Sequence, residues 1–354
     1  MKAVLRLDTA GALALAVFIC AAFGAAPGSA FGNVAPEVRL PEGSDIVWRR
    51  TLHNAPPNRD LLTKVKRLIE HSREQGDLRA LGQAEALLAK PTESTTEIAV
   101  LKAVIAQRKH AFSEATVMLK QVLAQAPRHP QANFTLHNVA LVQGNYALAL
   151  STCNRLGEIG YRLIQASCHY NLIGLEGQPE KAFTGLQSIL QNPPAHSELE
   201  SAWAMGTLAE LAAAINHPET ERYYSATLAL SPKDHYSAAG LADWHLRQGA
   251  PDKALTVLSG RPSTDRLDLL RLIALRQSKR PGSEPLQREL QQRFERASQR
   301  DETLHLYERA RFLLDVENNP RAALELAERN FAIQKERADL QLLQRARRTL
   351  EQMP

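Results

Sequence analysis

The chain has 354 residues, of which 44% are hydrophobic and 23% are charged, and its formal net charge is +5. This hydrophobic content excludes disorder over the whole length, and 9 Phe, 3 Trp and 7 Tyr are too few aromatic residues to indicate a β-sandwich or barrel. Three Cys exclude a disulfide-dense scaffold, and so small a charge on so long a chain does not indicate a nucleic-acid binder.

The first thirty residues, 1–30, have the order of a secretory signal peptide. Lys2 and Arg6 give a positive start, residues 10–23 carry no charge, and small residues follow up to Ala30. The apolar part is shorter than the roughly 20 residues that cross a bilayer. The order predicts export to a bacterial periplasm with cleavage near Ala30, and no stable membrane insertion afterwards. An uncleaved anchor or a buried N-terminal helix is the alternative.

Residues 31–57 are predicted to form an extended arm or linker. Prolines at positions 36, 41, 56 and 57 interrupt the stretch, and two glycines loosen it. Trp48 is expected to pin this arm to the first helices, and an untethered tail is the alternative.

Short breaks followed by alanine-rich stretches then recur with a period near 34 residues. They are anchored at Gly76, His110, Gly144, Gly177, Asn216 and Gly249. The spacings are 34, 34, 33, 39 and 33, so we expect an insertion in the one long interval, near 192–197. Apolar residues on both sides of each break recur in steps of three and four, which is the helical period. Each unit is therefore predicted to be a helix, a tight turn, a second helix and a loop.

These units resemble tetratricopeptide (TPR) repeats, whose period is 34 residues. Gly144-Asn145-Tyr146 with Ala149 matches the turn and the small residue at the helix crossing. The second helix and its terminator are matched by Ala115, Leu119, Leu123 and Pro127, and again by Ala182, Leu186, Leu190 and Pro194. The resemblance implies an all-α fold, a right-handed superhelical solenoid of TPR-like helix-turn-helix repeats, with about six repeats over 58–262. His110 replaces the usual turn glycine and is expected to cost some strain.

The segment 263–354 is predicted to hold degenerate TPR-like repeats and a C-terminal cap. Helices are expected over 267–276 and 286–299, over 302–316 and 321–333, and finally over 339–351. From Arg266 onward there are 18 Lys+Arg and 14 Asp+Glu with the signs interleaved. That mixing favours a solvated end cap, and an anionic partner is the alternative.

No catalytic or cofactor motif is found. The chain has no Gly-x-Ser-x-Gly, no phosphate-binding glycine loop, no Cys-x-x-Cys and no His-Glu-x-x-His. The prediction is a protein that is not an enzyme and that binds no cofactor or metal, with nearly all of its 11 His at exposed or turn positions. Glu302, His305 and Glu308 are the first candidates if the C-terminal part hides a site.

Cys153 and Cys168 are the thiols that remain if Cys20 leaves with the leader. They lie at equal distances from a turn near Gly160, and therefore at equal height on two antiparallel helices. Facing Cα atoms of packed helices come within disulfide range, and an exported protein meets an oxidising compartment. A disulfide is predicted, and two buried free thiols on different faces are the alternative.

In the TPR family the first helix of each repeat lines the inner groove. Placing those inner positions on this chain gives the candidate partner-binding residues Gln107, Arg108, Phe134, Asn138, Asn171, Tyr236 and Asp243. Asn138 and Asn171 lie 33 positions apart, about one repeat, and two stacked amides suit an extended peptide backbone. Ordinary solvation of these amides is the alternative.

The chain is thus predicted to be a non-enzymatic periplasmic scaffold or adaptor that binds a protein or peptide in its concave groove, and not nucleic acid. Two alternatives stay open. One is a component of the machinery that assembles envelope polysaccharide or the outer membrane. The other is an enzyme with an unrecognised site in the C-terminal part. The sequence determines neither the partner nor the oligomeric state.

Overall fold

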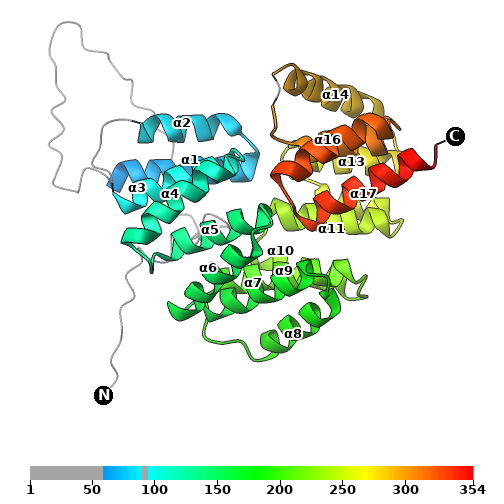
Figure 1. The fold of residues 1–354 in the computed structure, drawn as a ribbon. Coiled ribbons are helices and arrows are strands. Elements are labelled where there is room, and N and C mark those ends of the chain that lie inside the picture. The colour runs from blue at the N-terminus through cyan, green and yellow to red at the C-terminus, as the bar shows by residue number, and fades with distance from the viewer. Residues whose placement is uncertain (1–58, 90–94, 301, 354) are drawn as a thin grey trace, which may run out of the picture.

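The computed structural model describes residues 59–89, 95–300 and 302–353, and over these ranges the chain forms 17 helices and no strand (Figure 1). The predicted leader, 1–30, and the predicted arm, 31–57, lie outside the described residues.

Sixteen of the helices pair into eight consecutive hairpins, numbered below as units one to eight, and α17 follows them. The pairs are α1 (Arg59–Gln75) with α2 (Leu78–Leu88), α3 (Thr96–Arg108) with α4 (Phe112–Gln125), α5 (Pro130–Val142) with α6 (Tyr146–Glu158), α7 (Arg162–Leu175) with α8 (Pro179–Gln191), α9 (Glu198–Ala214) with α10 (Thr220–Leu230), α11 (His235–Arg247) with α12 (Pro251–Leu258), α13 (Asp265–Gln277) with α14 (Ser283–Gln299), and α15 (Leu306–Asp315) with α16 (Pro320–Ile333). The last helix, α17, spans Arg337–Glu351.

The eight hairpin turns share one backbone feature, a residue in the left-handed region. These residues are Gly76, His110, Gly144, Gly177, Asn216, Gly249, Lys279 and Asn318, with φ between 51° and 91°. All six breaks predicted from the sequence are among them, so the repeat is confirmed, and Lys279 and Asn318 extend it into the C-terminal part. The left-handed conformation costs a residue with a Cβ about 1–2 kcal/mol, which is the strain expected at His110.

Small residues stand where the two helices of a hairpin cross. Ala115, Ala149, Ala182, Ala254 and Ala323 each lie five positions after the turn residue, and all are fully buried. A methyl group at the crossing lets the helix axes approach closely, and larger neighbours fill the remaining space. This is the packing that the repeat pattern predicted.

The irregular parts also follow the sequence. The predicted insertion at 192–197 is the connection between α8 and α9, and α12 ends at Leu258, just before the left-handed Gly260. The predicted starts of the C-terminal helices differ by one to four residues, most at α15, which was expected to start at Glu302 and starts at Leu306. His305 has a φ of 63°, which no right-handed helix includes, so the helix begins after it.

The solenoid curves far enough for its first unit to touch its sixth. Glu74, at the end of α1, accepts a 3.0 Å hydrogen bond from Lys233 Nζ. The backbone carbonyl of Glu74 lies 2.9 Å from Nε2 of His235, the first residue of α11. Contacts between residues about 160 positions apart close one side of the concave face.

Candidate functional site

A short extended segment crosses the concave face of the solenoid. It joins α16 to α17 through residues 334–336, and we call it, together with the flanking helix ends Ile333 and Arg337, the strap. Gln334 has φ −126° and ψ 134°, and Glu336 has φ −72° and ψ 162°, so the backbone is extended. Glu336 and Asp339 cap α17 reciprocally in a capping box, which fixes the point where the strap ends.

The strap is held by backbone atoms of distant units. The Lys335 N–H donates a 2.7 Å hydrogen bond to the carbonyl of Val142, at the end of α5. The Arg337 guanidinium donates to the carbonyl of Gly174, near the end of α7. The Gln334 side chain lies 3.4 Å from His110 Nδ1, in the turn of unit two. The strap therefore contacts units two, three and four at the ends of their first helices.

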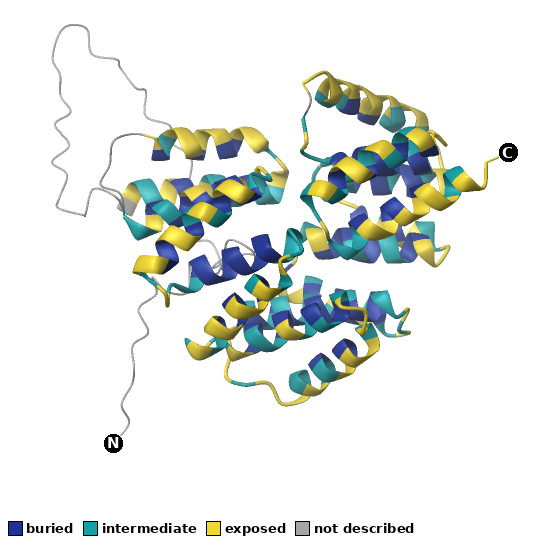
Figure 2. Ribbon diagram, in the orientation of Figure 1, coloured by how far each residue is buried: buried dark blue, intermediate teal, exposed yellow. Residues whose placement is uncertain are grey.

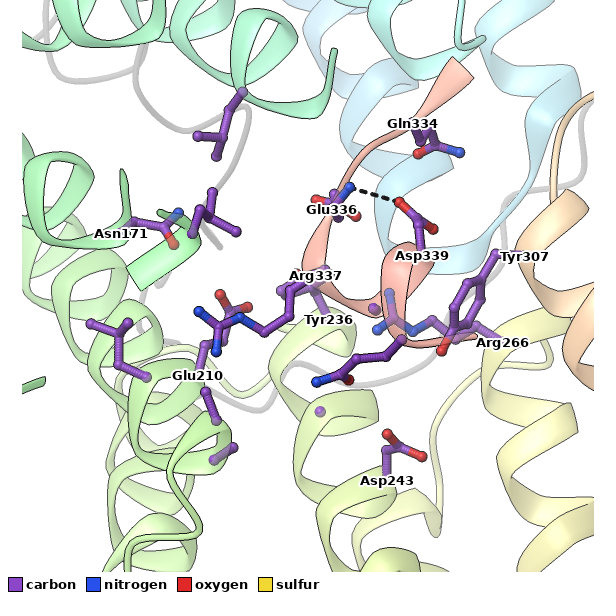
Figure 3. Close-up of a pocket in the computed structure, with 18 of the residues that line it drawn as sticks. Asn171, Glu210, Tyr236, Asp243, Arg266, Tyr307, Gln334, Glu336, Arg337 and Asp339 are labelled. Atoms are coloured by element: carbon purple, nitrogen blue, oxygen red, sulfur yellow. Dashed lines mark hydrogen bonds between the residues drawn. The ribbon is translucent and has the colours of Figure 1, made fainter. Parts of the chain in front are cut away.

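The strap and the first helices line a partly open cavity of about 310 Å³, which we call the central cavity. Its lining comes from units two to eight and from α17, and is mostly polar. Figure 3 shows Glu210 of α9, Tyr236 of α11, Arg266 of α13, Arg337 of the strap and Asp339 of α17 drawn together around it. Segments more than a hundred residues apart thus supply one site.

Two carboxyl groups of the central cavity, Glu210 and Asp339, have raised pKa values. Burial, and then the charge of Glu336, raise the pKa of Glu210 to about 7, although the Tyr236 hydroxyl lowers it in part. Burial and Glu336 likewise raise the pKa of Asp339 to about 7. Asp339 accepts hydrogen bonds from the Glu336 N–H at 2.9 Å and from Asn330 Nδ2 at 2.7 Å, which limit the shift.

Other charged groups of the cavity have a favourable partner nearby. Burial raises the pKa of Glu308, but the hydrogen bond and charge of His305 outweigh it and bring the value to about 2. The Arg266 guanidinium lies over the Tyr236 ring, 5.0 Å from its centroid. Such stacking of a cation on a ring is favourable where water is partly excluded. Burial lowers the pKa of Arg337, whose side chain extends toward Glu210 (Figure 3).

Glu210 should make stability depend on pH. Its pKa is about 7 in the folded state and 4.5 in the unfolded state, so folding favours the protonated carboxyl. The contribution of this group to the free energy of unfolding is fully present below pH 4.5 and is lost as pH rises through about 7. Glu210→Gln removes this proton uptake. We expect the free energy of unfolding of the parent to fall by about 1–3 kcal/mol relative to the variant between pH 4.5 and 8. Urea titrations over this range measure the difference, and parallel pH profiles would contradict the assignment.

The structure divides the predicted partner-binding residues into two groups. Asn171, Tyr236 and Asp243 line the central cavity. Asp243 is not free to bind a partner, because it accepts a 2.5 Å hydrogen bond from Arg311 Nη2 and lies 3.7 Å from Arg247. Tyr236 has half of its surface exposed, and this surface faces the cavity.

The other predicted residues lie deeper in the solenoid. Gln107, Phe134 and Asn138 are buried, and Arg108 is partly buried, with its pKa lowered by burial to about 10. Phe134 packs edge-to-face on Trp203 with the ring centroids 4.8 Å apart. The structure therefore does not present Phe134 on an open groove.

Sequence reasoning missed most of the cavity lining. Glu210, Arg266, Glu336, Arg337 and Asp339 were not singled out, and the last four were read as parts of a charged cap. For Glu336 and Arg337, a usable signal was the charged stretch 335–337 between two amphipathic helices. Nearly all His were expected at exposed or turn positions, whereas His137 is fully buried, with Nδ1 2.9 Å from the carbonyl of Ala149.

Cys153 of α6 and Cys168 of α7 are joined by a disulfide, with their Cα atoms 6.3 Å apart. The bond closes a loop with a sequence separation of 15, which is worth up to about 3 kcal/mol in the chain-entropy model. We expect Cys153→Ala/Cys168→Ala to lower the free energy of unfolding by up to that amount. Thiol labelling after denaturation without reductant should leave Cys153 and Cys168 unlabelled, and reactive thiols at both positions would contradict the pairing.

Of the three candidate enzyme residues, His305 and Glu308 lie together and Glu302 pairs elsewhere. His305 Nδ1 lies 3.7 Å from Glu308 Oε2, whereas Glu302 is bonded to Arg300. Within the described ranges no three His, Cys, Asp or Glu side chains converge as metal ligands would. In the same ranges no helix combines the length and the apolar character that crossing a membrane requires.

No family model and no curated protein sequence matches the chain. Solved structures match at low similarity. One is Pseudomonas aeruginosa pilF, at 15% identity and a TM-score of 0.40, over 56% of this chain and 90% of that one. A tetratricopeptide repeat protein from Parabacteroides merdae matches at 16% identity and 0.40, over 80% and 99%. A chain of the APC/C Cut9–Hcn1 hetero-tetramer matches at 16% and 0.42, over 82% and 49%. The chain's own repeat length, left-handed turns and alanine crossings make its described part an all-α solenoid of TPR-like repeats.

Proposed function

We propose that this protein is a non-enzymatic scaffold or adaptor that binds a protein or peptide partner along its concave face. The strap is the observation that carries the proposal. An extended piece of backbone already docks there, through a hydrogen bond to Val142 and a guanidinium on the Gly174 carbonyl. The ends of the first helices thus offer carbonyl groups to a bound extended chain, a common mode of peptide recognition.

We further propose that the protein acts in a bacterial periplasm. The support is the order of charged, apolar and small residues in 1–30, together with a disulfide that an oxidising compartment would maintain. Fractionation of cells that express the tagged chain tests this location. Recovery of a chain that retains residues 1–30 from the cytosol would contradict it.

Partner capture in intact cells tests the role of the concave face. Asn171 lines the central cavity, and Asn171→Ala removes an amide that can bond to a bound backbone. We expect crosslinked partner to fall several-fold. Asn192→Ala is the matched control, because Asn192 is exposed in the connection before α9. Equal capture by the two variants would rule out the concave face as the binding surface.

Asn138→Ala provides a second test on the same face. Asn138 is buried, and its Nδ2 donates no hydrogen bond to any residue in the described part of the chain. Alanine therefore removes a group that a bound backbone could satisfy without breaking a described hydrogen bond. We expect capture to fall while the thermal midpoint changes little. A drop in both would instead assign Asn138 to folding.

A further inference from the structure

In units two to five, many first-helix residues that face the concave surface are buried. α5 is buried at every position from Gln131 to Ala140, and Figure 2 shows this helix dark blue along most of its length. The buried inner positions, which we call the inner patch, are Val104, Gln107, Gln131, Phe134, Asn138, Ile164, Ser167 and Thr207. They belong to α3, α5, α7 and α9.

Three amide atoms of the inner patch are shielded from water and have no hydrogen-bond partner among the described residues. They are Oε1 of Gln107, Oε1 of Gln131 and Nδ2 of Asn138. A buried polar atom without a partner costs about 1–3 kcal/mol, so three on one surface call for a polar ligand. Amide groups on neighbouring helices match the alternating donors and acceptors of an extended backbone.

We infer that the occupant of the inner patch is the chain's own N-terminal arm, residues 31–57. The arm leads directly into α1, which begins at Arg59. α1 contacts α3, and α3 contacts α5. Neighbouring helices pack about 10 Å apart, so the patch begins within roughly 20 Å of the arm's end. A stretch of 27 residues spans up to about 90 Å when extended, which is ample.

The arm has the chemistry that the inner patch needs. Its four prolines disfavour a continuous helix over 31–57, which would leave backbone groups available to bond. Ile46, Val47 and Trp48 form an uncharged apolar stretch that suits Phe134 and Ile164, which are also uncharged and buried. Tethering raises the arm's effective concentration to the millimolar range, well above that of a free peptide.

This inference is independent of the proposed function, since the arm can dock whether or not an external partner exists. If both hold, the partner must displace the arm or bind beside it. The concave face would then be covered from two sides, by the arm over the inner patch and by the strap over the ends of the first helices.

Footprinting by hydroxyl radicals tests whether the arm covers the patch. We compare the purified full-length chain with Ile46→Ser/Val47→Ser/Trp48→Ser, whose changes are confined to the arm. Phe134 and Trp203 should be modified several-fold faster in the variant. Phe312 of unit eight, which is buried against Phe294 of unit seven, is the internal control and should not change. Unchanged modification of Phe134 and Trp203 would overturn the inference.

Photo-crosslinking then identifies the occupant. A diazirine amino acid in place of Trp48 should crosslink within one chain to peptides from α5, α7 or α9, at the mass of the monomer. Crosslinks at the mass of a dimer would show that a second copy donates the arm, and would overturn the inference as stated. Crosslinks confined to the outer surface, for example near the exposed Val117 of α4, or none at all, would also overturn it.

Discussion

Replacing Arg311 with alanine is expected to lower the free energy of unfolding by about 3 kcal/mol. Arg311 is a buried residue of α15. Its Nη2 lies 2.5 Å from Asp243 Oδ1 on α11, and its Nε lies 3.0 Å from Asp315 Oδ2. Removing the guanidinium leaves two partly buried carboxylates without their shared cation. Arg247 and Arg345 stay within reach of them, which keeps the cost at the lower end for a broken buried pair.

Urea denaturation at constant pH measures this effect. Arg347→Ala is the matched control, because Arg347 pairs with Glu328 on the surface, where both side chains are more than half exposed. Exposed pairs contribute about 0–1 kcal/mol, so the control should stay close to the parent. If the two variants were equally stable, the Arg311 pair would not hold unit eight against unit six.

The fold could be predicted from the sequence because its signals are local. A turn residue and an alanine five positions later recur in most units, and each hairpin is complete within about 34 residues. In the C-terminal part, the breaks expected between the paired helices fall at Lys279 and Asn318, which are left-handed turn residues although neither is glycine. Their left-handed φ shows that units seven and eight keep the geometry of the repeat after its sequence pattern has faded.

The site could be predicted only in part because its contacts are not local. Inner-face positions follow from the repeat, and Asn171 and Tyr236 do line the central cavity. Nothing in a 34-residue period indicates that residue 334 lies against residue 110, since the curvature of the whole solenoid brings them together. The part of the cavity lining that runs from Glu336 to Asp339 could therefore not be predicted from the repeat pattern.

The charged C-terminal segment also differs from its prediction. Interleaved charges were expected to form a solvated cap, yet several arginines place their guanidinium groups in partly buried ion pairs. Asp268 is almost fully buried and binds Arg271 at 2.6 Å and Arg293 at 2.9 Å. Alternating charge thus fits internal pairing between adjacent helices as well as solvation, and the sequence alone does not separate the two.

Lys335→Pro is expected to detach the strap from the concave face. Proline has no N–H, so the 2.7 Å hydrogen bond to the Val142 carbonyl is lost. The preceding residue tolerates the change, because Gln334 has a ψ of 134°, within the range that proline imposes on its neighbour. The lost bond should cost about 1–2 kcal/mol, and the first turn of α17 should exchange its amide hydrogens at least tenfold faster.

Hydrogen exchange read by mass spectrometry over residues 334–345 measures this release. Lys335→Ala is the matched control, because it keeps the backbone N–H and removes only an exposed side chain. If the strap covers a binding surface, Lys335→Pro should also capture more partner than Lys335→Ala, since less of the surface is already occupied. Faster exchange without a gain in capture would show that the strap closes the solenoid but does not compete with the partner. Equal exchange in the two variants would show that the hydrogen bond to Val142 does not hold the strap, which would leave the Arg337 contact with Gly174 as its anchor.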